Sequence, residues 1–297
     1  MRLIGLHITK CAGTSLVSTI KQGLTLDEYY LCSSITENIK QNHPEIFERE
    51  SVEKIKFVYG HYVHETMRTI FDDEKDVWFT VLRDPLTRLR SEWFQLYKTR
   101  MQNGLDQMPV AQYLEIYSNS ICQELVRAFP SANHAGSSML EAATIALRNF
   151  DYIFDSADFD KFLPLLQDFL EIDYSRRNFA LDNVSSNSEF FNDESFLRSV
   201  DELERSFDSS RSDDALLYRS ANIIRNPTTK INESFRTVDR SGAIDLLDRD
   251  LAMEMFMKHL ASYYRAEIEI SGGQRRVSQV IDSRVHWLSY LRKNINR

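Results

Sequence analysis

The stretch "LHITKCAGTSL" near the amino terminus joins a short apolar run to a helical pattern, and its polar residues could bind an anion. The start of a helix exposes amide groups and the positive end of the helix dipole, which favour a phosphate. Lys10 would add a point charge, and Gly13 would let the backbone approach the ligand closely. Thr14 and Ser15 would add hydroxyl donors. The sequence therefore predicts an anion-binding loop between a strand and a helix.

The order of residues in this loop differs from that in nucleotide hydrolases. Their phosphate loop places a lysine directly after the glycines, where it reaches the terminal phosphates, and an acidic partner holds the metal. Here Lys10 precedes Gly13, the single glycine of the stretch. A P-loop kinase or nucleotide hydrolase is therefore the alternative interpretation rather than the leading one.

The segment "VLRDPLTRLRSEWF" could hold a second anionic group. Arg83 ends an apolar run, and Ser91 follows eight positions later on a helix that begins near Pro85. The planar guanidinium of arginine can clamp a phosphate, and a serine hydroxyl can donate a further hydrogen bond. The two segments together predict a ligand with two separated anionic groups.

Four apolar runs, at 2–8, 56–60, 77–83 and 151–155, are typical of buried parallel strands. Helical patterns follow them and fill the middle of the chain, so we expect an α/β fold with a central parallel sheet, flanking helices and additional helical segments. The carboxyl ends of parallel strands meet at one edge of the sheet, where ligands bind. The residues expected at that edge are His7, Thr9, Gly60, His61 and Arg83.

The composition is that of a globular chain. With 297 residues and 42% hydrophobic residues, it can form one large domain spanning 1–297. Within it, the acidic, Ser-rich segment 182–214 is predicted to be an insertion or a mobile surface region. Residues 266–297 are predicted to form a C-terminal loop and helix, and the loop contains a basic stretch at 271–278.

The charge and the cysteines narrow the class of protein. A net charge of −8 argues against a nucleic-acid binder, which needs an excess of Lys and Arg. Three cysteines without paired spacing favour a reducing compartment, and Cys11 is expected to pack as a small apolar residue. The chain shows neither a signal peptide nor an apolar run long enough to span a bilayer. We therefore expect a soluble, cytoplasmic protein.

The two anion-binding segments resemble those of sulfotransferases. "LHITKCAGTSL" is similar to their 5′-phosphosulfate loop, in which a Pro-Lys pair precedes small residues, and "LRDPLTRLRSEWF" is similar to their 3′-phosphate element. "LRNFDYIFDSADFDKFLPLL" resembles a strand and helix of the carbohydrate-type and bacterial members. The resemblance extends loosely over about residues 2–265. It implies a P-loop-like α/β fold and the donor 3′-phosphoadenosine 5′-phosphosulfate (PAPS), which leaves as adenosine 3′,5′-bisphosphate (PAP).

The resemblance also implies roles for individual residues. Lys10 would contact the transferring sulfuryl group, and Arg83 and Ser91 would hold the 3′-phosphate. Thr9 departs from the family pattern, which has proline at this position. The rest of the loop would bind the 5′-phosphate: Cys11, Ala12, Gly13, Thr14 and Ser15.

Transfer of a sulfuryl group to a hydroxyl needs a base, and histidine is the commonest candidate near neutral pH. "YGHYVHET" places His61 just after a strand and resembles the Gly-His element of uronosyl 2-O-sulfotransferases, so we expect His61 to be the base. His64 and Glu65 are the alternatives. His61 and His64 could also form half of a zinc site, but no third ligand lies nearby in the sequence, and the resemblance implies no metal.

The leading hypothesis is thus a PAPS-dependent O-sulfotransferase with His61 as base and Lys10 on the leaving group. Its acceptor would be a hydroxyl of a glycan, glycolipid or small metabolite. The competing hypotheses are the P-loop kinase or hydrolase and a catalytically silent nucleotide-binding scaffold. If the protein is a sulfotransferase, the basic stretch 271–278 would either close over the 3′-phosphate or form an exposed turn. The oligomeric state is left open.

Overall fold

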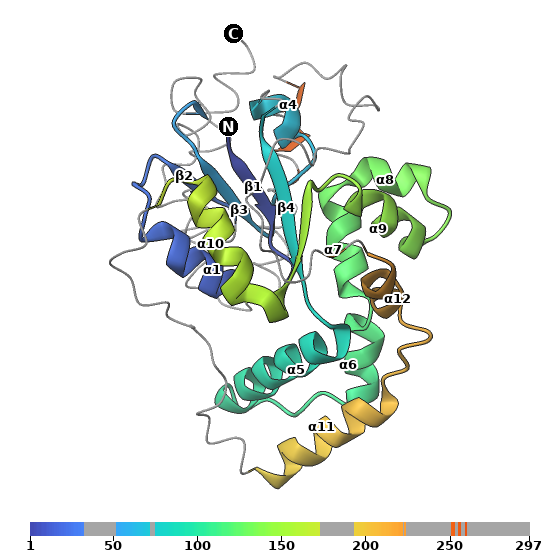
Figure 1. Ribbon diagram of the computed structural model, residues 1–297. Coiled ribbons are helices and arrows are strands. Elements are labelled where there is room, and N and C mark those ends of the chain that lie inside the picture. The colour runs from blue at the N-terminus through green and yellow to red at the C-terminus, as the bar shows by residue number, and fades with distance from the viewer. Residues whose placement is uncertain are drawn as a thin grey trace, which may run out of the picture. The chain divides into compact units, whose positions relative to one another are not determined.

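The computed structural model describes residues 1–32, 52–71, 75–172, 193–221, 223, 251–252, 255–256 and 259. Its central feature is a parallel sheet of five strands in the order β2-β3-β1-β4-β5, flanked by helices (Figure 1). The α/β class predicted from the sequence is therefore confirmed. The strands are β1 (Leu3–Leu6), β2 (Tyr29–Leu31), β3 (Phe57–Gly60), β4 (Val77–Leu82) and β5 (Tyr152–Asp155).

The strands are buried on both faces, as expected for a parallel sheet. The apolar runs predict β1, β3, β4 and β5, and the structure confirms all four. They give no signal for β2, because three residues are too few to show a period. In register, Leu6 pairs with Gly60 in β3, and Leu82 pairs with Asp155 in β5.

The chain divides into two compact units, interleaved in sequence. Unit 1 comprises 1–6, 24–77 and 239–297, and unit 2 comprises 7–23 and 78–238. The single domain predicted from the sequence stays a prediction. The predicted C-terminal loop and helix, 266–297, and the basic stretch 271–278 lie outside the described residues.

Unit 1 is anchored by a buried ion pair at the start of β1. Arg2 Nη1 lies 2.8 Å from Asp76 Oδ2, and the Arg2 backbone N–H donates to Oδ1 of the same carboxylate at 2.8 Å. The guanidinium also lies 5.0 Å from the ring centroid of Phe71. These contacts satisfy a charge that burial would otherwise destabilise. Besides the strands, unit 1 contains the short helix α4 (Met67–Phe71).

Unit 2 is mainly helical. Helix α5 starts at Pro85, where Asp84 caps it by accepting from the Thr87 N–H at 2.9 Å, as the N-terminal position of proline predicts. A 3₁₀ turn, η2 (Ser156–Asp158), links β5 to the helix that follows it. The α-helices of unit 2 are α1 (Gly13–Lys21), α5 (Pro85–Gln102), α6 (Val110–Tyr117), α7 (Ser120–Ala128), α8 (Pro130–Ala135), α9 (Met139–Leu147), α10 (Phe159–Phe169), α11 (Glu194–Ser206) and α12 (Asp213–Ser220).

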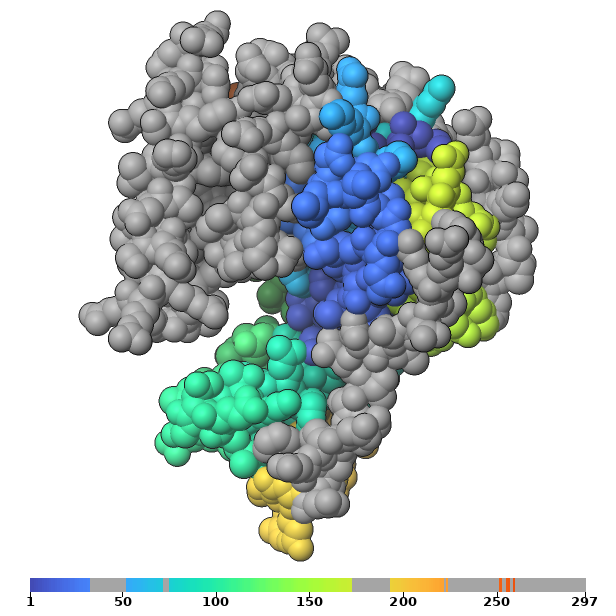
Figure 2. Space-filling view, turned by 90° about the vertical axis from the view of Figure 1, so that its left-hand side faces the viewer, coloured from blue at the N-terminus to red at the C-terminus, as the bar shows by residue number. Residues whose placement is uncertain are grey.

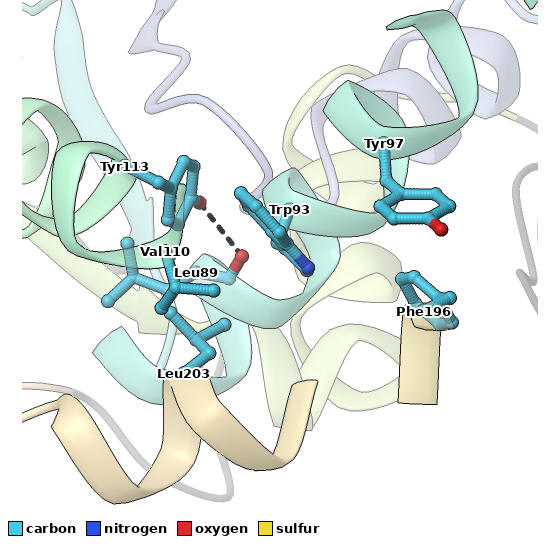
Figure 3. Close-up of a cluster of buried hydrophobic side chains, with 7 residues drawn as sticks. All are labelled: Leu89, Trp93, Tyr97, Val110, Tyr113, Phe196 and Leu203. Carbon is cyan, nitrogen blue, oxygen red and sulfur yellow. Dashed lines mark hydrogen bonds between the residues drawn. The ribbon is translucent and has the colours of Figure 1, made fainter. Parts of the chain in front are cut away.

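A buried aromatic cluster joins α5, α6 and α11 (Figure 3). Trp93 donates from Nε1 to Ser199 Oγ of α11 at 2.9 Å, and Tyr113 donates from its hydroxyl to the Leu89 carbonyl at 2.9 Å. Helix α11 lies directly against α5 in the space-filling view (Figure 2). The members of the cluster are Leu89, Trp93, Tyr97, Val110, Tyr113, Phe196 and Leu203.

The helices α11 and α12 correct the prediction for the acidic segment 182–214. Its described part, 193–214, forms helices that contribute buried side chains to unit 2, among them Leu203 and Asp214, so it is not a surface region throughout; that the segment is an insertion stays a prediction. The acidic composition arises because α11 is amphipathic, with exposed charges on one face and apolar residues on the other. Residues 182–192 lie outside the described part of the chain.

Among the described residues, the helices are too short or too polar for any of them to cross a membrane.

Leu203→Ala tests whether α11 is part of the core. The substitution should destabilise the protein by about 3 kcal/mol, because it removes most of a fully buried side chain and leaves a cavity in its place. Leu197→Ala is the matched control, since Leu197 lies on the same helix at 44% exposure and should change stability by less than about 0.5 kcal/mol. Denaturant unfolding followed by tryptophan fluorescence gives both values. Equal effects of the two substitutions would show that α11 does not pack as described.

Candidate anion-binding site

The loop between β1 and α1 holds two residues in an unusual backbone conformation. Lys10 has φ 67° and Ala12 has φ 63°, the left-handed region that residues other than glycine seldom adopt. Each such residue destabilises the chain by about 1 kcal/mol or more, and strain of this kind clusters at ligand sites. Ala12 is also the N-cap of α1 and has no side-chain oxygen that could cap the helix. The N-cap side chain of α1 therefore does not compete with an anion for the first amide groups of the helix.

Gly13 opens α1, and a side chain of the loop lies directly against it. A Cβ atom at this position would lie 2.0 Å from Nε2 of His7, so the imidazole ring occupies the space next to the Gly13 Cα. The φ of Gly13 does not lie in the left-handed region. The sequence predicts that a ligand approaches the Gly13 backbone closely; in this structure the His7 ring occupies that space.

The structure brings Lys10 and Arg83 together. Arg83 follows β4, and its Nη1 donates to the carbonyl oxygen of Lys10 at 3.2 Å. Lys10 Nζ donates to Gln95 Oε1 on α5 at 2.5 Å. Burial lowers the pKa of Lys10, nearby Glu92 raises it, and Arg83 lowers it. Two cations therefore lie at the loop: Arg83 binds its backbone, and Lys10 extends its ammonium group to Gln95 of α5.

Ser91 lies on the face of α5 that Lys10 reaches. It precedes Gln95 by four residues, which places the two side chains next to each other on one side of the helix. Ser91 is partly buried, and its hydroxyl makes no hydrogen bond within the described part of the chain. The serine predicted for the second anionic group is thus one helical turn from Gln95, the residue that accepts the hydrogen bond of the Lys10 ammonium.

The remaining loop residues differ in exposure. Thr14 is exposed, and Ser15 is buried with its carbonyl accepting from the Thr19 hydroxyl at 2.9 Å. Cys11 is fully buried and burial raises the pKa of its thiol, which confirms the expected packing role. Cys11 can therefore reach a ligand only through its backbone. Ala12 is partly buried.

Glu124 is a residue of the site that the sequence did not reveal. It lies on α7, and its Oε2 accepts from the backbone N–H of Thr9 at 2.9 Å. Burial raises the pKa of this carboxyl to about 7, although Thr9 and Arg88 oppose the shift, and Glu92 adds to it. In "ICQELVRAF" Glu124 looks like any polar residue of an amphipathic helix, so no sequence signal marks it. The bond also gives Thr9 a role that proline could not fill, because proline has no N–H.

A buried charge network fixes the helices that carry these residues. Arg88 of α5 is fully buried, with Nη1 2.6 Å from Glu92 Oε2 and Nη2 2.7 Å from the Tyr117 carbonyl. Asp214 of α12 lies 3.9 Å from the same guanidinium. Its carboxylate accepts from the amides of Ile121 and Cys122 at 2.9 and 2.8 Å, and so caps α7. Burial raises the pKa of Asp214 to about 6.

The predicted base, His61, lies in unit 1. It directly follows Gly60, where a Cβ atom would lie 2.3 Å from the Cys32 carbonyl carbon, so this turn needs glycine. His61 is partly exposed. Lys10 and Arg83 belong to unit 2, and the catalytic pairing of His61 with Lys10 stays a prediction.

The two alternatives to His61 are buried. His64 is 3% exposed, its Nδ1 accepts from the Thr66 N–H at 3.3 Å, and burial lowers its pKa to about 4. Its ring centroid lies 4.2 Å from that of His259. Glu65 is 7% exposed. Of the three candidates, His61 is therefore the one whose side chain keeps substantial contact with solvent.

Comparison of the chain with protein-family models and with curated proteins found no match. Within the described ranges, His, Cys, Asp and Glu side chains form no group of three or more that could hold a metal ion.

The double substitution of His7 and Gly13 measures the contact between them. Gly13→Ala should destabilise the protein by about 1 kcal/mol, because the added methyl group displaces the imidazole ring. In a His7→Ala background the same change should be neutral or stabilising, since alanine favours a helix over glycine. The coupling energy from chemical denaturation gives the size of the contact. Equal effects of Gly13→Ala in both backgrounds would show that the His7 ring does not lie against Gly13.

Glu124→Gln should change how stability depends on pH. The folded pKa of about 7 lies above the unfolded value, so the stabilisation from the protonated carboxyl is complete below pH 4.5 and is lost as the pH rises through 7. Glutamine keeps an acceptor for the Thr9 N–H and has no charge. The variant should therefore match the wild type near pH 4.5 and exceed it at pH 8 by at most about 3 kcal/mol, less to the extent that water reaches the side chain.

The control for this measurement is Glu115→Gln, on the exposed face of α6. It should leave the shape of the stability curve unchanged. Parallel curves for Glu124→Gln and the wild type would mean that Glu124 titrates normally.

Proposed function

We propose that this protein is a PAPS-dependent O-sulfotransferase with a P-loop-like sheet. The observation that carries the proposal is the convergence of Lys10 and Arg83 on a strained loop whose helix has no side-chain cap. Amide groups at a helix start bind a phosphate, and two cations beside them favour an anionic ligand. Ser91, one turn from the Lys10 contact, adds a donor for a second phosphate.

The position of Lys10 favours a phosphosulfate over a nucleoside triphosphate as the ligand. Its backbone lies in the loop ahead of α1, and its ammonium extends along α5 toward Gln95. In transfer, Lys10 would leave Gln95 and stabilise the negative charge that develops on the oxygen leaving the sulfur atom. Neutral Gln95 holds Lys10 by a hydrogen bond without cancelling its charge, so the lysine can be released to a stronger anionic partner.

In the proposed reaction His61 removes the proton of the acceptor hydroxyl. The acceptor oxygen forms a bond to sulfur as the bond from sulfur to the phosphate oxygen breaks, and the electron pair stays on PAP. Lys10 balances that charge, and Arg83 and Ser91 hold the 3′-phosphate. The acceptor class proposed is a hydroxyl of a small glycan, glycolipid or metabolite.

Binding of PAP tests the ligand. Lys10→Ala and Arg83→Ala should each weaken PAP binding about tenfold to a hundredfold, because each removes a charge-assisted contact. Lys21→Ala, at the other end of α1, and Arg90→Ala, on the exposed face of α5, are matched controls that should leave the affinity unchanged. Calorimetric titration gives the constants. Stabilisation by ATP with magnesium, and none by PAP, would favour the kinase or hydrolase instead.

His61→Ala tests the base. The variant should bind PAP normally and lose activity by about 10²- to 10⁴-fold with an accepted hydroxyl substrate. His134→Ala, at an exposed position of α8, is the control and should retain activity. Normal turnover of His61→Ala would overturn the assignment. Tight PAP binding without transfer to any of a broad panel of hydroxyl compounds would favour the silent scaffold.

A further inference from the structure

The hydrogen bond between Glu124 and Thr9 ties a carboxyl group directly to the anion loop. Glu124 Oε2 accepts from the Thr9 N–H at 2.9 Å, and Thr9 immediately precedes left-handed Lys10. Arg83 holds the carbonyl of Lys10 at 3.2 Å. The loop is thus fixed at two consecutive residues, by an acidic group on one and a basic group on the other.

We propose that Glu124 is a proton-linked positioning residue of this loop, which takes up a proton when an anion binds beside Lys10. It acts through Thr9 and does not touch the anion. The proposal rests on the proposed function in one respect, namely that the natural anion is the phosphosulfate of the donor. The chemistry requires only a negatively charged oxyanion in the loop.

Three carboxyl groups lie near the site, and their partners decide which of them takes the proton. Glu92 forms an ion pair with Arg88 at 2.6 Å. Asp214 accepts from two amides of α7 and faces the same guanidinium. Glu124 is held by Thr9, whose groups carry no formal charge. An anion in the loop repels all three, and Glu124 is the one of the three whose partner is the uncharged Thr9 rather than the Arg88 guanidinium.

The charged groups around Glu124 come from every element packed against it. The loop and its approach contribute His7, Lys10 and Cys11, Arg83 follows β4, and Arg88 and Glu92 lie on α5. Asp214 lies on α12, and its carboxylate accepts a hydrogen bond from the first turn of α7. Helices α8 and α9 also pack on α7, but their titratable groups are exposed; these are His134, Glu141 and the C-cap residue Arg148.

The direction of the effect follows from the linkage between proton and anion. If the anion favours the protonated carboxyl, then protonation favours the anion equally. Affinity should therefore rise as the pH falls from about 8.5 to 7, by at most tenfold per pH unit for one proton. Sulfate is a suitable probe, because it has no ionisation of its own in this range.

The experiment measures binding of sulfate and of PAP to the full chain at pH 7.0, 7.75 and 8.5. Calorimetry in buffers of different ionisation enthalpy counts the protons exchanged. The wild type should take up a fraction of a proton and bind more weakly as the pH rises. Glu124→Gln keeps the acceptor for the Thr9 N–H. This variant should bind the anion with a flatter pH dependence and take up a smaller fraction of a proton. Glu124→Ala, which removes the acceptor, should weaken anion binding at every pH. Stronger binding by Glu124→Gln than by Glu124→Ala would show that the hydrogen bond to Thr9 positions the loop.

Thr9→Pro is a second variant that leaves Glu124 in place. It removes the donated N–H and should also remove the dependence of binding on Glu124. Glu115→Gln is the control.

The outcomes separate this inference from the proposed function. PAP binding with the same pH dependence in the wild type and Glu124→Gln would overturn the inference and leave the function standing. Sulfate binding that depends on Glu124, without PAP binding, would support the inference and overturn the function. Binding of neither ligand to the wild type would overturn both.

Discussion

The buried guanidinium of Arg88 is the constraint on which the arrangement of unit 2 depends. A charge without access to water must be paired, and removing one partner of such a pair destabilises a protein by about 3 to 5 kcal/mol. Arg88 finds its partners in Glu92, in the Tyr117 carbonyl and, at longer range, in Asp214. These groups come from α5, from the end of α6 and from α12, so a single side chain fixes how three helices pack.

The positions of the site residues follow from this network. Asp214 also caps α7, and α7 carries Glu124 against the loop. Helix α5 carries Ser91 and Gln95 to the other side of Lys10. The strained loop is therefore supported by helices that are themselves held by a buried charge. A framework of this kind can maintain Lys10 and Ala12 in a conformation that each of them disfavours.

The electrostatics of the site differ from those of a simple phosphate cradle. Lys10, Arg83 and Arg88 lie near the site together with Glu92, Glu124 and Asp214, so three positive charges balance three negative ones when all six groups are ionised. An anion would enter a site of low net charge, where the protonation of a carboxyl changes the potential substantially. Arg88 and Asp214 are buried and the other four groups are partly buried, so each change of charge has a stronger effect than it would have at the surface.

The sequence by itself determined the α/β class, four of the five strands, the loop with Lys10 and Gly13, and the placement of Arg83 at the end of a strand. These features are local: an apolar run, a helix start and a turn depend on neighbouring residues, and the carboxyl ends of parallel strands must share an edge. Only the tertiary structure showed that the described part of the acidic segment 182–214 is helical and partly buried. It alone also showed that His7 covers Gly13 and that Glu124 holds Thr9. The Thr9 contact joins residues 115 positions apart, and no period or motif in the chain encodes a pairing at that distance.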